Sequence, residues 1–323
     1  MLSRVACNLY WMGRQLERAE NTARIISVHG NLLMDLPRGT TVFGWEPLIT
    51  IISNDDYFQE RYRVARELNV VKFLLADTEN PSSIISALGQ ARENLRTTRD
   101  IIPREAWEAL NGLYLTATER VSDGLSRRTR HEYLKRIIRG SQQISGLLAG
   151  TMSHGIAYHF LCLGHFLERA DMTTRILDAR AAGLLPEHDQ GPTLSPVENI
   201  QWMSILKSLT AYQMYRQHVR LRVQGPDVLN FLLRDIDFPR AVGFCLFRIE
   251  RGLGLLPPRS EPREQIKRLQ QRLDMTDVSA LVDGGLHQFI DELQTDLAEL
   301  HNSLDRNYFN PQAVVDSQSA LLS

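Results

Sequence analysis

Residues 13–24 read GRQLERAENTAR, and residues 164–175 read GHFLERADMTTR. The two stretches share seven of twelve residues at one fixed offset, and Glu20 is replaced by Asp171, which keeps the charge. Chance rarely preserves so many identities together with both acid–arginine pairs, so the pattern predicts an internal duplication. The segments that carry the two stretches, about residues 2–35 and 151–182, each have the periodicity of a long helix.

Helical geometry gathers the charges of each stretch on one side. At about 100° per residue, a glycine, two acids and the last arginine fall within a stripe about 60° wide. The stripes consist of Gly13, Glu17, Glu20 and Arg24, and of Gly164, Glu168, Asp171 and Arg175. Arg18 and Arg169 are expected to point about 100° away from their stripes. Because glycine permits close approach of another backbone, we expect the helices to cross near Gly13 and Gly164 with pseudo-twofold symmetry, the acids of one reaching an arginine of the other.

The rest of the chain also favours helices. They are expected at residues 56–76, from Ser82 or Ser83 to about 102, from Pro103 onward, at 127–149, at 196–222, from Asp237 to before Leu256, and at about 280–306. Residues 48–52 suit a strand by propensity but have no partner strand, so we expect a buried helical segment there. The stretch from about 184 to 198 is rich in Pro, Gly and Asp and is expected to be a loop. The predicted fold is all-α: one large multi-helix bundle over residues 1–323.

Composition narrows the function classes. The formal net charge of −1 gives no sign of a nucleic-acid or acidic-membrane partner. Cys7, Cys162 and Cys245 are far apart and form no CxxC pair, which suits a reducing compartment and argues against a zinc or iron–sulfur site. We expect no signal peptide, and no run reaches the roughly 18 apolar residues of a membrane span, so the expected location is the cytoplasm.

Catalytic motifs are weak in this sequence. His154, His159 and His165 are spaced five and six residues apart, which scatters them around a helix instead of forming a metal site. Cys162 and His165 are three residues apart but have no third group to orient them. No GxxxxGK[ST] or GxGxxG stretch marks a nucleotide-binding loop.

The charged stripes themselves have two interpretations. One is a buried ion-pair network that fixes helix register, and the residues alone favour it. The other is a polar pocket for a charged small molecule or a peptide end, since arginine pairs with carboxylate or phosphate and acids pair with an amine. Adjacent arginines should keep the acids ionised, which argues against acid–base catalysis by them.

Four segments carry a family resemblance. They are Ser3-Arg4 through Tyr10-Trp11 with the LERAE motif at 16–20, Ala91-Arg92-Glu93-Asn94 with Arg99-Asp100 and Trp107-Glu108, Thr151-Met152 through the LERAD motif at 167–171, and Asp237-Phe238-Pro239-Arg240 leading to Cys245-Leu246. In this order they resemble the alpha-E domain, an all-helical family with a Glu-Arg motif, over about residues 2–310. The positions of this chain that match the motif are Glu17, Arg18, Glu168 and Arg169.

The resemblance implies a functional context. Alpha-E proteins accompany, or are fused to, a circularly permuted ATP-grasp ligase, often with a transglutaminase-like peptidase and a proteasome-like peptidase. It therefore implies a pathway of ATP-driven amide bond formation, in which ATP and magnesium belong to the ligase and this chain needs no cofactor.

Three hypotheses follow. The first is a partner module that binds the ligase and helps hold a peptide or amino-acid substrate in a charged groove. The second is an independent enzyme in which Glu17 or Glu168 acts on an amide or ester, and the third is a purely structural scaffold. The candidate groove residues are Glu17, Arg18, Glu20, Arg24, Glu168, Arg169, Asp171 and Arg175, with Asp237 and Arg240 as secondary candidates.

Overall fold

The computed structural model describes residues 1–35, 44–52, 55–181, 196–219 and 223–310, and these residues contain helices and no strand. The α-helices are α1 (Ser3–Asp35), α2 (Pro47–Ile51), α3 (Asp55–Tyr62), α4 (Glu67–Leu75), α5 (Ile84–Arg96), α6 (Arg104–Glu119), α7 (Val121–Leu125), α8 (Arg130–Thr151), α9 (Ile156–Ala181), α10 (Pro196–Ser208), α11 (Tyr212–His218), α12 (Gly225–Arg234), α13 (Val242–Gly254), α14 (Ser260–Met275), α15 (Ala280–Asp283) and α16 (Leu286–Leu304). A π-helical turn, η1 (Asp305–Phe309), follows α16. The predicted all-α class is confirmed.

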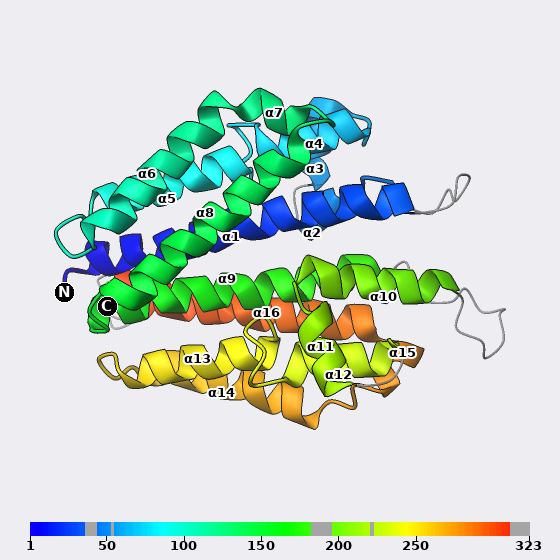
Figure 1. The fold of residues 1–323 in the computed structure, drawn as a ribbon. Coiled ribbons are helices and arrows are strands. Elements are labelled where there is room, and N and C mark those ends of the chain that lie inside the picture. Colours follow the sequence, from blue (N-terminus) through cyan, green and yellow to red (C-terminus); the bar gives the residue numbers. More distant parts are fainter. Residues whose placement is uncertain (36–43, 53–54, 182–195, 220–222, 311–323) are drawn as a thin grey trace.

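The two helices that carry the repeated motif run side by side through the middle of the molecule (Figure 1). A side chain at Gly13 would overlap the backbone carbonyl oxygen of Leu161, and one at Gly164 would overlap that of Tyr10. The backbones of α1 and α9 therefore touch where both helices lack a Cβ atom. The predicted crossing at the two glycines is confirmed.

Each central helix forms a group with three helices that follow it in sequence, two of which pack against it. α1 packs against α5 and α8, and α6 joins those two on the outside. α9 packs against α13 and α16, and α14 joins those two (Figure 1). The two groups thus have the same order of contacts around their central helix. The similar arrangement of the two groups is consistent with an internal duplication, which remains a prediction.

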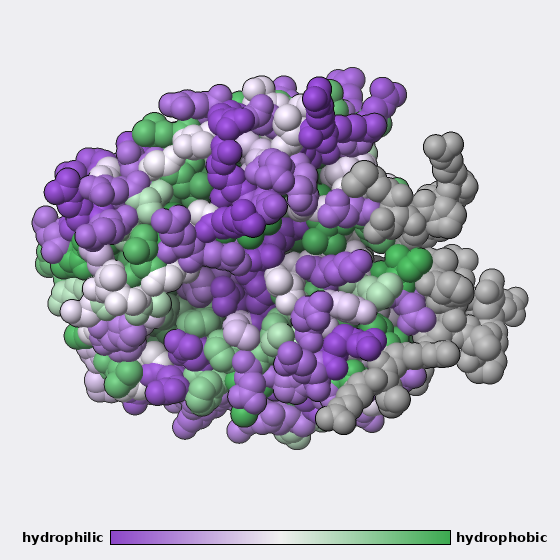
Figure 2. Space-filling view, viewed as in Figure 1, coloured by the Kyte–Doolittle hydropathy of each residue, from purple (hydrophilic) through white to green (hydrophobic). Residues whose placement is uncertain are grey.

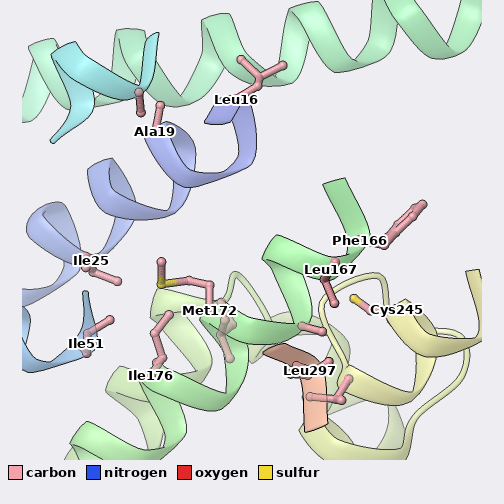
Figure 3. Packing of buried hydrophobic residues seen from close by; sticks show 14 of the residues in the cluster. Leu16, Ala19, Ile25, Ile51, Phe166, Leu167, Met172, Ile176, Cys245 and Leu297 are labelled. Carbon is pink, nitrogen blue, oxygen red and sulfur yellow. The ribbon is translucent and has the colours of Figure 1, made fainter. Parts of the chain in front are cut away.

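The core is continuous between the two groups. Figure 3 shows Met172 and Ile176 of α9 near Ile25 of α1 and Ile51 of α2, and all four side chains are almost fully buried. On the other side of α9, Leu297 belongs to the leucine-rich face of α16. That face is buried, as its spacing predicts for packing against the bundle; its members are Leu286, Ile290, Leu293, Leu297, Leu300 and Leu304.

Several predicted helix bounds are wrong, because the chain turns where the pattern continues. The helix predicted at 56–76 is two helices, α3 and α4, separated by Arg63 with a left-handed φ of 57°. Thr210, with φ of 56°, separates α10 from α11 in the same way. The C-terminal helix begins at Leu286 and not near 280. Gly285, the residue before it, has a φ of +83°, so the helix does not extend back through this residue.

Other bounds also shift. The helix from Ser83 ends at Arg96 and not near 102, although Ser83 caps it as predicted by accepting a 3.2 Å hydrogen bond from the Ser86 amide. Asp237-Phe238-Pro239 precedes α13 instead of starting it, and α12 was not predicted as a separate helix. Residues 48–51 are helical, Ile52 caps the helix, and the segment is mostly buried, as expected. The predicted loop at 184–198 lies largely outside the described residues, and α10 begins at Pro196.

Candidate functional site

The repeated Glu-Arg pairs exchange partners between the two central helices. Arg169 of α9 donates to both carboxylate oxygens of Glu17 at 2.9 and 2.8 Å. Arg18 of α1 donates to both oxygens of Glu168 at 2.5 and 3.0 Å. Each arginine therefore forms a two-point fork with the glutamate of the opposite helix, the geometry that fixes orientation as well as charge. On both helices the fork residues follow the contacting glycine by four or five positions, so the two forks tie α1 to α9 about one turn beyond the glycine contact.

A second cation reaches each glutamate, and here the two halves differ. Glu168 also accepts from Arg14 at 2.8 Å. The position corresponding to Arg14 in α9 is His165, whose Nδ1 lies 3.3 Å from Glu17. Arg240, from the loop between α12 and α13, then supplies the second charge to Glu17 at 3.0 Å. Where the repeat replaces arginine with histidine, a distant loop completes the ion pair.

Arg240 is held tightly in that place. Its guanidinium also donates to Asn21 at 2.6 Å and to Glu20 at 2.7 Å. Its carbonyl oxygen accepts a 2.9 Å hydrogen bond from the Thr173 hydroxyl of α9. The loop that carries Arg240 is thereby attached to both central helices, and its side chain is buried.

Burial and pairing keep the glutamates charged. Burial alone would raise the pKa of Glu17, but the charges of Arg169 and Arg240 hold this pKa well below its usual range. Burial likewise opposes ionisation of Glu168, and Arg18 and Arg14 lower its pKa to about 2. Both side chains are at most 1% exposed. Both carboxylates are closed off from solvent and fully paired. For these two residues this favours the interpretation as a buried ion-pair network that fixes helix register.

The structure corrects one prediction about the arginines. Arg18 and Arg169, expected to point away from the stripes, make the contacts between helices. The stripe arginines pair with acids of their own helix: Arg24 pairs with Glu20 at 2.6 Å and Arg175 with Asp171 at 2.8 Å. The helical wheel fixes only the direction of Cβ, and the long arginine side chain curves around the helix to the partner glutamate.

The two secondary candidates, Asp237 and Arg240, differ in their relation to the ion-pair network. Arg240 belongs to the network, whereas Asp237 is exposed and forms no part of it. Arg14, Asn21 and His165 join the network without having been candidates. The repeat offset gave the signal for His165, because it aligns with Arg14 across the crossing.

Two adjoining cavities open beside the Glu17 half of the network. The Arg240 cavity, of about 280 Å³, is lined by Glu20, Arg24, Gln142, Ser145, Arg169, Leu209, Thr210, Phe238, Pro239 and Arg240. The Arg248 cavity, of about 340 Å³, is lined by Met12, Gly13, Leu16, Ser145, Gly146, Leu148, Ala149, Tyr158, Leu161, Cys162, His165, Phe166, Arg169 and Arg248. Ser145 and Arg169 line both, so we call the two together the charged groove.

The opposite half of the network has little open space. The cavity next to Glu168 and Arg18 is only about 80 Å³, because Ile51 and Ile52, at the end of α2, fill that side. Figure 2 shows the face on which α8 lies, where hydrophilic residues gather in a recess near its centre. Of the predicted groove residues, Glu20, Arg24, Arg169 and Arg240 line the charged groove; Arg18, Glu168, Asp171 and Arg175 lie on the filled side.

Cys162 and His165 line the groove, but their protonation states are not those of a nucleophilic pair. Burial raises the pKa of the Cys162 thiol, and burial together with Arg169 lowers the pKa of His165 to about 3. A thiol and a neutral imidazole are the reverse of an activated thiolate–imidazolium pair. Among the residues that the structure describes, no cluster of His, Cys, Asp or Glu could hold a metal ion, and no helix is long and apolar enough to cross a membrane.

The buried histidine predicts a pH dependence of folding. An unfolded His165 takes up a proton below about pH 6.5, whereas the folded residue stays neutral to about pH 3, so stability falls as the pH falls through this window. From pH 7 to pH 5 we expect this residue to remove about 2 kcal/mol from the free energy of unfolding. Urea unfolding followed by circular dichroism measures it.

The matched variants identify the source of this loss. His165→Gln should reduce the slope between pH 7 and pH 5, while His131→Gln, at an exposed position on α8, should leave it unchanged. His301, whose pKa burial lowers to about 4, is expected to contribute about as much over this window, because its folded pKa also lies below pH 5, so His165→Gln should remove about half of the slope that the two residues produce together. Equal slopes in wild type and His165→Gln would show that His165 is not the residue responsible.

Curated relatives are distant and longer than this chain. The uncharacterized protein Mb2597 of Mycobacterium bovis is 23% identical over 327 residues, and the uncharacterized protein Rv2567 of Mycobacterium tuberculosis is 22% identical over the same length. Each alignment covers 93% of this chain but only 35% of the relative, so the chain spans about a third of their length. No solved structure shows a significant match.

The family comparison agrees with the geometry. The Alpha-E family model, described as a predicted alpha-helical domain with a conserved ER motif, matches residues 1–309. In the structure the Glu-Arg motif occurs once on each central helix, and its two copies pair with one another. With a match over nearly its whole length, the chain belongs to the Alpha-E family.

Proposed function

We propose that this chain is a non-catalytic partner module of a cytoplasmic ATP-grasp amide ligase system. It binds the circularly permuted ATP-grasp ligase and holds a peptide or amino-acid substrate in the charged groove. ATP and magnesium bind to the ligase and not to this chain, and the transglutaminase-like and proteasome-like peptidases belong to the same pathway. The ligase context rests on the Alpha-E resemblance, and the binding role rests on the groove.

The observation that carries the binding role is the charge of the groove. Arg24, Arg169, Arg240 and Arg248 line it, whereas Glu20 is the only acid among its described lining residues. Even when the enclosed Glu17 is counted, arginines outnumber acids. An anionic group such as a substrate carboxylate would complete this balance.

The length of the relatives supports a partner role. In the mycobacterial relatives, the sequence outside the similar segment amounts to about twice its length. In these relatives the similar segment shares a chain with other sequence, which supports a role together with another protein or domain.

The alternative of an independent carboxylate enzyme fits the site poorly. A general acid or base needs a pKa near the working pH and contact with the substrate. Glu17 and Glu168 are held ionised, are sealed from solvent and have two arginine partners each. A role in fixing the register of α1 and α9 is compatible with a binding module, since a rigid helix crossing preserves the shape of the groove.

The test is copurification of this chain with the ATP-grasp ligase, followed by ATP turnover by the ligase with and without it. We expect a stable complex and a turnover that needs the chain. The control is Gly164→Ala, in which the chain is present but the helix crossing is disrupted. Absence of a complex together with unchanged turnover would contradict the partner role.

A further inference from the structure

The Arg248 cavity lies between four helices and has a polar end and an apolar wall. It is bounded by α1, α8, α9 and α13, and its volume of about 340 Å³ is at the small end for ligand sites. Such a space suits one or two amino-acid residues better than a nucleotide cofactor. The apolar wall is formed mainly by Leu16, Leu148, Leu161 and Phe166.

Arg248 is the unusual residue in this cavity. Its guanidinium stacks 4.7 Å from the ring centre of Phe166 and 5.7 Å from that of Phe244, and among the described residues it forms no ion pair. In Figure 3 the Phe166 ring projects from α9 on the side away from Met172. The stack holds the planar guanidinium in place while leaving its N–H donors free for a ligand.

The other charges around the cavity are already balanced. Arg169 is occupied by a two-point fork with Glu17, and His165 is buried beside the same carboxylate. The cavity therefore offers one unpaired positive charge, which matches a single carboxylate. No Asp or Glu is among the described residues that line it, so a ligand ammonium group would have no partner there.

We propose that the Arg248 cavity binds the C-terminal residue of a peptide. The carboxylate pairs with Arg248, the apolar side chain packs against the wall of Leu148, Leu161 and Phe166, and the amide nitrogen carries no charge. A free amino acid fits less well because its ammonium group would lose water without gaining an acid. This inference rests on the proposed function, since it names the substrate class that the partner module would hold.

The experiment is isothermal titration calorimetry of the isolated full chain with small probes. N-acetyl-leucine should bind, while N-acetyl-leucinamide, which lacks the charge, should bind at least about tenfold more weakly. Free leucine and inorganic phosphate separate the other sources of an anion. Equal binding of the amide, or tighter binding of free leucine or phosphate than of N-acetyl-leucine, would overturn the proposal, as would no binding of N-acetyl-leucine.

Two pairs of variants locate the site. Arg248→Gln should weaken N-acetyl-leucine binding at least about tenfold, whereas Arg251→Gln should leave it unchanged. Arg251 is the matched control because it lies on the same helix and stacks 5.7 Å from the Phe247 ring, on an exposed position. Equal affinity in wild type and Arg248→Gln would overturn the assignment.

The second pair fills the cavity without a clash. A Cβ at Gly146 of α8 meets no atom within 4 Å, so Gly146→Leu should fold and place its side chain over the cavity. Gly150→Leu, one turn further along and equally open, is the control outside the cavity. Loss of binding in the first variant alone supports the site, and retained binding in both contradicts it.

The two proposals fail in different ways. Peptide binding is measured on the isolated chain and does not need the ligase. Binding without a ligase complex would sink the ligase partnership only, and a ligase complex without peptide binding would sink the cavity assignment only.

Discussion

Gly164→Ala is expected to lower the free energy of unfolding by at least about 3 kcal/mol. The new Cβ would overlap the carbonyl oxygen of Tyr10, and this contact is with backbone, which cannot rotate away. α1 and α9 must then separate, and the two Glu-Arg forks beside the contact lengthen with them. Urea unfolding followed by circular dichroism at 222 nm measures the loss.

The control for this substitution is another glycine in a long helix. Gly146→Ala meets no atom within 4 Å, so the only expected effect is the gain in helix propensity, about 1 kcal/mol in favour of folding. The two changes add the same methyl group with opposite expected signs. A Gly164→Ala protein as stable as wild type would mean that the backbones do not touch at this point.

Glu17→Gln is expected to cost about 3 kcal/mol or more. The change keeps the shape of the side chain but removes the charge that Arg169 and Arg240 share. Both arginines are largely buried, with side chains 13% and 9% exposed, so they cannot replace the lost partner with bulk water. The unfolding free energy near pH 7 is the quantity to measure.

An exposed ion pair provides the comparison. Glu108 pairs with Arg104 at 2.7 Å on the surface of α6, where the two side chains are 57% and 86% exposed. Glu108→Gln should change the stability by less than about 0.5 kcal/mol, since water and salt screen such pairs. Similar costs for the two substitutions would show that the Glu17 network contributes no more than a surface pair.

The sequence pattern predicted the centre of the fold because the repeated motif itself indicates both the two helices and the point where they meet. Glycine at the head of each stripe indicated a close crossing, and the periodicity of residues 2–35 indicated the long helix that provides it. The helix breaks were missed for a physical reason. Arg63 and Thr210 take positive φ values that neither residue favours, so tertiary packing and not local propensity decides those turns.

The site was predictable only in part. The motif residues Glu17, Arg18, Glu168 and Arg169 were identified, but the direction of the two arginines was not, because a helical wheel does not follow a flexible side chain. Arg240 entered only through its family segment, since it comes from a loop more than two hundred residues from Glu17. Arg248 had no signal at all: its place in the proposal comes from the lack of an ion-pair partner among the described residues, which only packing reveals.

The exchange of partners between the two Glu-Arg motifs is tested most directly by double-mutant cycles, measured by urea unfolding. For the pairs Glu17–Arg169 and Arg18–Glu168 we predict that the single Gln substitutions are not additive, with coupling energies of about 1–3 kcal/mol. For the sequence neighbours Glu17 and Arg18 we predict coupling close to zero. Additive effects across the helices, or strong coupling only between sequence neighbours, would contradict the exchange of partners on which the account depends.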